Sequence, residues 1–336
     1  NKHVVALSSG TAAIHLGLIQ LGIEPGDEVI CQSCTFAASA NPVKYLGANP
    51  VFVDSETDTW NLSPVFLEEA IRDRIRKTGK KPKVIIPVDL YGMPAKMDEI
   101  TAIAGHYGIP VLEDAAEALG SAFNGQKCGT FGELACLSFN GNKIITTSGG
   151  GALVCSTAGQ AGKTLFLATQ ARDEAVHYQH SVVGYNYRLS NVCAGIGRGQ
   201  MEALPGYVKR RRKINRIYRD FLSEIEGVSF QTEPTGAYFS NYWLTGILID
   251  PAKTNGITND SIRIACGMEN IETRPLWKPL HLQPVFRDCP FYGNSTSEYL
   301  FEHGLCLPSG TSLSDEDIHY VVESVIRIIK NKIHGY

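Results

Sequence analysis

The sequence predicts an α/β protein in which a mostly parallel sheet lies between layers of helices and a smaller α+β domain follows. Before residue 228, short apolar runs rich in Val and Ile alternate with longer segments whose apolar residues recur at helical spacing, which is the pattern of repeated β-α units. After it the elements become shorter, and 336 residues exceed the length at which one hydrophobic core stops growing. We therefore expect a large domain over 1–227 and a small domain over 228–336.

The first β-α unit consists of a strand over 4–7, expected to be buried, and a helix over 11–21. They are joined by the turn Ser8-Ser9-Gly10-Thr11. A turn of small residues before a helix offers unpaired backbone N–H groups and the positive end of the helix dipole, which favours a bound phosphate. The turn matches neither the dinucleotide motif GxGxxG nor a P-loop, and taken alone an ordinary helix N-cap explains it equally well.

The alternation continues through four more strands and three more helices. The strands are expected at 28–31, 50–54, 83–88 and 109–114, and the helices at 36–46, 67–75 and 97–107. In sheets of this kind, ligands collect at the carboxyl ends of the strands. We therefore expect the side chains that follow these ends to converge, namely Thr11, Phe36, Asp89 and Asp114.

Lys143 lies in a loop of small and hydroxylated residues within the segment 134–155, between two apolar runs. The runs leave no room for a helix and so predict adjacent antiparallel strands. A lysine side chain is flexible and strongly hydrated, and it becomes a nucleophile only where burial or a nearby cation lowers its pKa. A surface lysine is the more common case. The choice between the two depends on what lies near Lys143.

The residues at the strand ends favour a site for pyridoxal phosphate. This cofactor requires a lysine for a Schiff base, an aromatic ring that stacks on its own ring, a carboxylate that keeps its pyridine nitrogen protonated, and a seat for its phosphate. Lys143, Phe36, Asp114 and the turn at Ser9 supply one of each. A positive charge within a few ångströms lowers the pKa of a carboxyl group, which would keep Asp114 ionised even when buried.

The remaining chain contains helices, short strands and one strongly basic run. We expect a helix from residue 158, two long helices up to about residue 227, a strand over 243–249 and a last amphipathic helix over 315–333. The basic run, 209–213, is followed by apolar residues at helical spacing. We therefore interpret it as the solvent-exposed face of a helix rather than as a phosphate-binding patch.

Composition and charge exclude several classes of function. A net charge of −3 gives no general attraction to nucleic acid or to an acidic membrane surface. No apolar run reaches the roughly 18 residues of a membrane helix, and the start does not resemble a signal peptide. We expect a cytoplasmic protein whose partners are small molecules or other subunits. The chain enters a strand almost at once and lacks an initial Met, so we expect that a leading segment is missing.

The nine cysteines predict neither disulfides nor a metal site. They are scattered and lie mostly in apolar stretches, as reduced and packed thiols do. Cys31 and Cys34 form a single CxxC pair, and no second pair follows at metal-binding spacing. We therefore predict no metal cofactor.

Several motifs, in order along the chain, resemble those of the DegT/DnrJ/StrS family. That family consists of fold-type I, pyridoxal-phosphate-dependent aminotransferases with a seven-stranded type of sheet, and they act on nucleotide-linked keto-sugars. The resemblance covers essentially the whole chain. Its motifs are SGTA at 9–12, EDAAEALG at 113–120, GTFG at 129–132, SFNGNK at 138–143 with GGG at 149–151, GYNYRL at 184–189, RPLWKPLH at 274–281 and LCLPSG at 305–310.

The resemblance implies that several individual residues of this chain bind the cofactor. Lys143 would carry pyridoxal phosphate covalently, Asp114 would pair with the pyridine nitrogen, and Phe36 would stack on the ring. Glu117 falls where relatives often carry Gln or His near the ring hydroxyl. The phosphate would be held by Ser9, Gly10, Thr11 and Ser138, and by Asn186 from the neighbouring subunit, which implies a homodimer with shared active sites.

The resemblance also implies the reaction. L-glutamate would donate its amino group to the cofactor, which would pass it to the keto-sugar, with Lys143 as the general base. The candidates for contacts with the nucleotide sugar are Arg188, Arg274, Trp277 and His281, each of which could instead be a structural ion pair or a packed aromatic. Substrate contacts from the short segment that precedes the first strand in the family cannot be assigned to this chain.

The motifs look most like enzymes of the UDP-N-acetylbacillosamine type, which aminate a UDP-linked 4-keto-6-deoxy sugar in surface polysaccharide biosynthesis. Another 3- or 4-keto nucleotide-sugar aminotransferase, such as the GDP-perosamine type, is the alternative. A sugar dehydratase of the family would carry His at the position of Lys143. A non-catalytic regulatory protein would be expected to have lost Lys143 or Asp114, and both are present. An aldolase or decarboxylase on the same fold is the remaining alternative.

Overall fold

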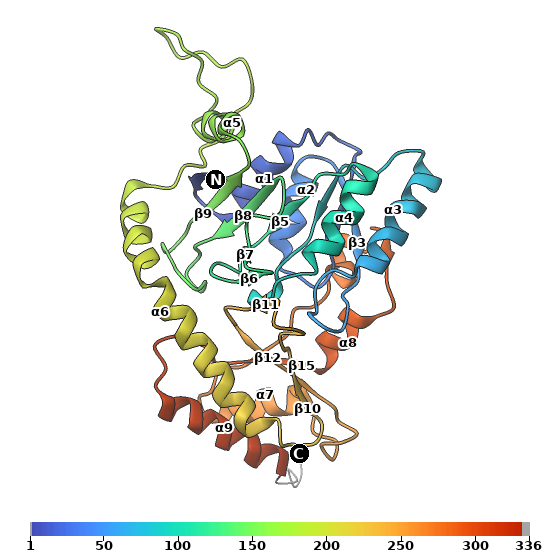
Figure 1. The fold of residues 1–336 in the computed structure, drawn as a ribbon, viewed down its shortest axis with the longest axis vertical. Coiled ribbons are helices and arrows are strands. Elements are labelled where there is room, and N and C mark those ends of the chain that lie inside the picture. The colour runs from blue at the N-terminus through green and yellow to red at the C-terminus, as the bar shows by residue number, and fades with distance from the viewer. Residues whose placement is uncertain (1, 331–336) are drawn as a thin grey trace.

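The computed structural model describes residues 2–330 (Figure 1). Within them, eight strands form one central sheet in the order β1-β9-β8-β5-β4-β2-β3-β14, in which two parallel bridges, Ile85 to Val111 and Val88 to Asp114, join β4 to β5. All neighbours pair in parallel except β9, which is antiparallel to β1 and β8. The strands are β1 (His3–Leu7), β2 (Glu28–Gln32), β3 (Asn49–Val53), β4 (Val84–Ile86), β5 (Leu112–Asp114), β8 (Leu134–Ser138), β9 (Gly151–Cys155) and β14 (Phe291–Tyr292).

The mostly parallel sheet is confirmed, as are the antiparallel strands on either side of the lysine loop. Two strands are shorter than expected because a proline, which lacks the N–H that a ladder needs, lies beside each: Pro87 follows β4 and Pro110 precedes β5. The expectation that residues 4–7 are buried is wrong for most of the strand. β1 is an edge strand, Val4 is 59% exposed, and only Leu7 is buried.

Helices cover both faces of the sheet. Successive residues of a strand point to opposite faces. Thus Val29 and Cys31 belong to the core formed with α1, α2 and α5, whereas Ile30 belongs to the core formed with α3 and α4. These helices are α1 (Gly10–Gln20), α2 (Asn41–Tyr45), α3 (Pro64–Thr78), α4 (Met97–Tyr107) and α5 (Ala158–Ala168).

Two helix predictions need correction at their bounds. The helix expected over 36–46 is a 3₁₀ turn, Ala37–Ser39, followed by the short α2. The helix expected over 67–75 is longer: α3 begins after the N-cap Ser63, continues through part of the predicted polar loop, and ends before Gly79 in the left-handed conformation. Both of its ends carry the usual cap residues.

One 32-residue helix, α6 (Asn191–Leu222), replaces the two long helices that we expected. It contains Pro205, which is exposed and interrupts the backbone hydrogen-bond ladder without ending the helix. The prediction that the basic run 209–213 lies on a solvent-exposed face holds for Lys209 and Lys213, which are exposed, but is wrong for Arg211. Consecutive helical residues are about 100° apart, so five of them surround the helix. Arg211 is accordingly buried and donates to the backbone oxygen of Trp243, at 2.5 Å.

A second sheet follows α6, with the order β10-β12-β15-β13. Its strands are β10 (Val228–Phe230), β12 (Thr245–Ile249), β13 (Arg274–Pro275) and β15 (Gly304–Leu307), and it packs with α7 (Asn259–Met268), α9 (Asp315–Lys330) and the second half of α6. The strand expected over 243–249 is β12, and the predicted last helix, 315–333, runs beyond the described residues. Ile214 and Tyr218 belong to this core although they precede residue 228. The division of domains at that residue stays a prediction.

The chain returns from the second sheet to the edge of the first. β14 pairs in parallel with β3, about 240 residues earlier in the sequence. Beside this pair, the carboxylate of Asp54 accepts hydrogen bonds from the backbone N–H groups of Asn294, Thr296 and Ser297 at 2.8–3.0 Å, at the start of α8 (Thr296–His303). Asp54 thus caps a helix from the far end of the chain.

Three further short strands, β6 (Ala122–Phe123), β7 (Gln126–Lys127) and β11 (Tyr238–Phe239), form a small sheet between the two larger ones. Over residues 2–330, the helices include none that combines the length and the apolar character needed to cross a membrane.

Candidate active site

A cavity of about 1150 Å³ lies where the carboxyl ends of the central strands meet the second sheet. It brings together residues that are far apart in the sequence. Of the thirteen predicted site residues, ten line it: Ser9, Gly10, Thr11, Phe36, Asp114, Glu117, Ser138, Lys143, Arg274 and Trp277. Asn186, Arg188 and His281 do not.

The turn before α1 is built to hold an anion. Ser9 is the N-cap, and its Oγ accepts the backbone N–H of Ala12 at 3.0 Å. The N–H groups of Gly10 and Thr11 donate to no acceptor within residues 2–330, and both residues line the cavity. Space around Gly10 is limited, because a Cβ there would lie 3.1 Å from Cβ of Ser138. Unpaired N–H groups at a helix N-terminus fit the phosphate of pyridoxal phosphate.

Asp114 ends β5 and is buried, with 4% of its surface exposed. Its Oδ2 accepts the hydroxyl of Ser39 at 2.7 Å, and its Oδ1 accepts the backbone N–H of Ala116 at 3.2 Å. Burial raises the pKa of Asp114, while these hydrogen bonds and the charge of Lys143 act in the opposite direction. A buried carboxylate in a cavity is stabilised by a cation beside it, which is what a protonated pyridine nitrogen supplies.

Lys143 is not a surface residue, since only 12% of its side chain is exposed. Its Nζ lies 3.2 Å from Oε1 of Glu117 and 4.1 Å from the centre of the indole ring of Trp243. The loop is held in turn by the Nε1–H of Trp243, which donates to the backbone oxygen of Asn142 at 2.8 Å. The ordinary interpretation of a lysine on an exposed loop is therefore excluded by the geometry.

Glu117 connects the lysine to the adjacent strand end. It is 4% exposed, and its Oε2 accepts the backbone N–H of Tyr91 at 2.7 Å. Burial raises the pKa of Glu117 to about 6, against the lowering effect of Lys143. A carboxyl group with this pKa changes its protonation state close to neutral pH, which suits it to share a proton with a neighbouring group.

An aromatic wall borders the same cavity. Phe36 is 60% exposed, and its ring centre lies 5.7 Å from that of Trp277. Trp277 is itself fixed, because its backbone N–H donates to the hydroxyl of Tyr91 at 3.0 Å and the two rings lie edge to face. Arg274 lines the cavity with a side chain that is 76% exposed and forms an ion pair with Glu272.

The three predicted residues outside the cavity have other surroundings. His281 was expected to contact the substrate. Instead its Nδ1 is 2.7 Å from the hydroxyl of Ser33, its Nε2 is 3.2 Å from a carboxylate oxygen of Glu298, and its ring stacks on Phe291. Both ring nitrogens are thus occupied in packing contacts. Asn186 and Arg188 are exposed on the segment between α5 and α6, and neither lines the cavity of its own chain.

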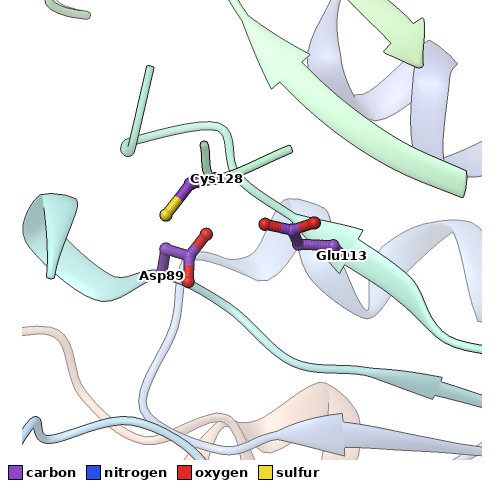
Figure 2. A group of neighbouring side chains, drawn as sticks. All are labelled: Asp89, Glu113 and Cys128. Atoms are coloured by element: carbon purple, nitrogen blue, oxygen red, sulfur yellow. The ribbon is translucent and has the colours of Figure 1, made fainter. Parts of the chain in front are cut away.

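Asp89 also departs from the expectation that the strand-end side chains converge. It is 1% exposed and points toward Glu113 and Cys128 rather than into the cavity (Figure 2). The backbone turns sharply after β4, where Leu90–Gly92 form a 3₁₀ turn, and the N–H of Ala95 donates to Oδ1 of Asp89 at 2.9 Å.

Sequence reasoning missed two residues of the site. Ser39 orients Asp114, and the only local signal for it is a hydroxyl in a short turn after Phe36. Trp243 contacts Lys143 from one hundred residues away, and no motif precedes it. A contact between two distant segments leaves no periodic pattern in either of them.

The fold and the site together define a pyridoxal-phosphate-dependent enzyme: a lysine and two carboxylates are buried at the strand ends of an α/β sheet, opposite a helix N-terminus. The aminotransferase family model DegT/DnrJ/EryC1/StrS matches residues 1–326. The chain belongs to this family.

Individual relatives agree with this assignment. EpsN of Bacillus subtilis (strain 168), named as a pyridoxal phosphate-dependent aminotransferase, is 49% identical over 331 residues, which are 97% of this chain and 84% of EpsN. A GDP-perosamine synthase of Escherichia coli O157:H7 is 37% identical over 98% of this chain and 87% of its own length. The crystal structure of a DegT/DnrJ/EryC1/StrS aminotransferase from Brucella abortus has a TM-score of 0.90 at 31% identity, over 98% of this chain and 86% of the other. The protein is a sugar aminotransferase with pyridoxal phosphate as its cofactor.

Proposed function

We propose that the enzyme transfers the amino group of L-glutamate to a nucleotide-linked 4-keto-6-deoxy sugar for the biosynthesis of a glycan or surface polysaccharide. The observation that carries this proposal is the placement of Lys143, Glu117 and Asp114 in one cavity with the anion-binding turn at Gly10. The family and the names of the relatives support a sugar as the acceptor. Glutamate as the donor follows from the resemblance of the motifs.

The residues of this chain divide the chemistry among them. Pyridoxal phosphate supplies an electron sink that makes the Cα–H bond of an amino acid acidic. Lys143 would hold the cofactor covalently and, once its Nζ is released, would move the proton between carbon atoms as a general base. Asp114, oriented by Ser39, would keep the ring nitrogen protonated. Glu117 accepts a hydrogen bond from Nζ and so keeps the amine close to the reacting atoms.

Two nucleotide-linked sugars are candidates for the acceptor of the amino group. The motifs at 113–120 and 138–143 resemble those of enzymes that act on a UDP-linked 4-keto-6-deoxy-N-acetylhexosamine, which supports this sugar as the first candidate. A GDP-linked sugar is the second candidate, because a relative that is 37% identical over nearly the whole chain is named GDP-perosamine synthase. The cofactor form that has already accepted the amino group can be tested against a panel of UDP- and GDP-linked 3- and 4-keto sugars. The partner that restores the original spectrum identifies the substrate.

We further propose that two chains share their active sites. The segment between α5 and α6 extends away from the body of the molecule (Figure 1) and then returns to it. At this return, Asn186 pairs with Thr169 and Arg188 pairs with Leu7, and both residues are exposed. Exposed apolar side chains continue from this segment along the first half of α6, namely Val176, Tyr178, Val183, Val192, Ile196 and Met201. An exposed apolar surface of this extent favours contact with another protein surface, and we propose that a second copy of this chain covers it. Analytical sedimentation of the protein should show a dimer. The variant Asn186→Ala should bind the cofactor more weakly while remaining a dimer.

Absorbance tests the reaction directly. The lysine-bound cofactor should show a visible band that disappears when L-glutamate is added and returns when the keto-sugar nucleotide follows. An unchanged spectrum with glutamate, in an enzyme that has bound the cofactor, contradicts the choice of donor. Loss of carbon dioxide or cleavage of a carbon–carbon bond instead would support a decarboxylase or an aldolase.

A further inference from the structure

The indole of Trp243 touches the lysine loop at two points. Its ring face lies under the amine of Lys143, with Nζ 4.1 Å from the ring centre. Its edge donates the Nε1–H to the backbone oxygen of Asn142, at 2.8 Å. One side chain therefore fixes both the backbone that carries the lysine and the amine at the lysine's end.

Trp243 is held rigidly enough to do this. It is 2% exposed, its backbone N–H donates to Oδ1 of Asn241 at 2.8 Å, and its backbone oxygen accepts from Arg211. Asn241 also donates to the backbone oxygen of Glu117 at 2.8 Å, so the segment that carries the indole is tied to the residue on the other side of the amine. Gly92 is required here, since a Cβ would lie 1.8 Å from Oδ1 of Asn241.

The amine thus has neighbours on two sides, and both interact with its charged form. The face of an indole carries negative charge density and attracts an ammonium group, more strongly when water is excluded. The carboxylate of Glu117 lies 3.2 Å away on the other side. A flexible four-carbon side chain would otherwise have many positions available in a cavity of this size.

We propose that Trp243 is a positioning residue that holds the amine of Lys143 beside Glu117 whenever the amine is not bonded to the cofactor. The inference rests on the role of Lys143 given under the proposed function. The amine leaves the cofactor and returns to it in each cycle, and a defined resting position removes the need to search for the geometry of attack.

The test uses the cofactor-free protein and a limiting amount of acetic anhydride, followed by peptide mass spectrometry. Only an unprotonated amine reacts, so the labelling rate of Lys143 against pH reports how strongly its surroundings favour the ammonium form. The exposed Lys163 serves as the internal reference. The variants are Trp243→Leu, which removes the aromatic face, Trp243→Phe, which keeps a face without the N–H, and Trp60→Phe as the control at a buried tryptophan that does not contact Lys143.

For Trp243→Leu, we expect about tenfold faster labelling of Lys143 near neutral pH, with the rate curve displaced toward lower pH. In Trp243→Phe, the labelling rate of Lys143 should stay within about threefold of the rate in the unmodified protein. Because this variant lacks the hydrogen bond to the backbone oxygen of Asn142, its affinity for pyridoxal phosphate should be about fivefold weaker. Trp60→Phe should change neither quantity.

Three results would overturn the proposal. One is labelling in Trp243→Leu that matches the control, and another is a rise that is equal at every pH, because then only access to Lys143 has changed. The third result concerns Trp243→Phe, which decides the question if Trp243→Leu does not fold. An affinity of Trp243→Phe for pyridoxal phosphate equal to that of the unmodified protein would overturn the proposal. None of these measurements involves glutamate or a sugar, so their outcome is separate from that of the reaction test.

Discussion

Glu113 and Asp114 are adjacent on β5, yet they serve two different regions of the molecule. Successive strand residues point to opposite sides, and both are buried, at 0% and 4% exposure. Asp114 faces the cavity, where Ser39 and Ala116 occupy part of its hydrogen-bonding capacity. Glu113 faces the loop 129–132, where it accepts the backbone N–H groups of Gly129, Phe131 and Gly132 at 2.5, 2.8 and 3.4 Å.

The Glu113 side contains a second buried acid. One ligating atom each from Asp89, Glu113 and Cys128 lies within 4.8 Å of the others (Figure 2). Burial raises the pKa of both carboxyl groups, and the charge of Glu113 raises the pKa of Asp89 further. Two carboxylates this close cannot both be ionised without a cation, so a proton on Asp89 resolves the conflict. Its Oδ2 accepts no hydrogen bond within residues 2–330, which suits an oxygen that carries this proton.

The comparison shows that burial alone does not identify a catalytic acid. Glu113 is a carboxylate whose oxygens are occupied by backbone donors, so it fixes a loop. Asp114 has a similar burial but borders a cavity, so a ligand can reach it. Substitutions on the two sides should therefore separate activity from stability.

The largest effect is expected at the cavity, from Lys143→Ala. Without the amine, the cofactor has no covalent anchor and the proton has no base, so the half-reaction with glutamate should be abolished. The turn at Gly10 remains, so part of the affinity for the cofactor should persist, measurable by equilibrium dialysis. Retained turnover would show that Lys143 is not the catalytic lysine.

Asp114→Asn should give the next largest loss of activity with little loss of stability. An amide cannot stabilise a protonated ring nitrogen, so the rate of the half-reaction should fall about 100-fold or more. Because burial already disfavours the ionised carboxyl, the free energy of unfolding of the cofactor-free protein should change by no more than about 1 kcal/mol. Stopped-flow absorbance and urea unfolding measure the two quantities.

Glu113→Gln should show the reverse behaviour. The amide replaces one oxygen that accepts backbone N–H groups by an NH₂ group that cannot, which should lower the free energy of unfolding by about 2–4 kcal/mol. The half-reaction rate of the folded fraction should fall much less than in Asp114→Asn. Equal losses of activity in both variants would remove the distinction between the two sides.

Asp89→Asn should have the smallest effect, and its size should depend on pH. The pKa of Asp89 is raised in the folded state above its ordinary 3.8, so its contribution to stability is complete at low pH and is lost as the pH rises through the folded value. An amide keeps the donor that the protonated acid provides to Glu113 and does not ionise. Unfolding by urea at several pH values should show the variant gaining on the unmodified protein as the pH rises. A variant that loses ground instead would mean that Asp89 is ionised.

The sequence was sufficient for the periodic parts of the fold and for the residues that stand in motifs. Strands such as β2 and the helix α4 follow from local spacing, and Lys143 and Asp114 stand in runs of unusual composition. The fold class was predicted because β-α alternation is repeated many times. Each unit alone was weak evidence.

The features that could not be predicted from the sequence depend on contacts between distant segments. His281 stands in a motif, but its neighbours Ser33 and Glu298 decide that it packs rather than lines the cavity. In the basic run of α6, the burial of Arg211 was not predicted because its hydrogen-bond acceptor, the backbone oxygen of Trp243, comes from elsewhere in the chain. Asp89 could not be separated from Asp114 by its position after a strand, because the direction of the turn after β4 determines where its side chain points.

The return of the chain to β3 has a consequence for synthesis on the ribosome. The first sheet is nearly complete once β9 has emerged from the ribosome. The strand that covers the outer edge of β3, and the three N–H groups that donate to Asp54, are synthesised only with residues 290–297. A nascent chain must therefore wait with an open, apolar strand edge while more than one hundred residues are added, a state that invites pairing with other chains. A product released early, even one that carries Lys143 and Asp114, should be a substrate for chaperones rather than a small working enzyme.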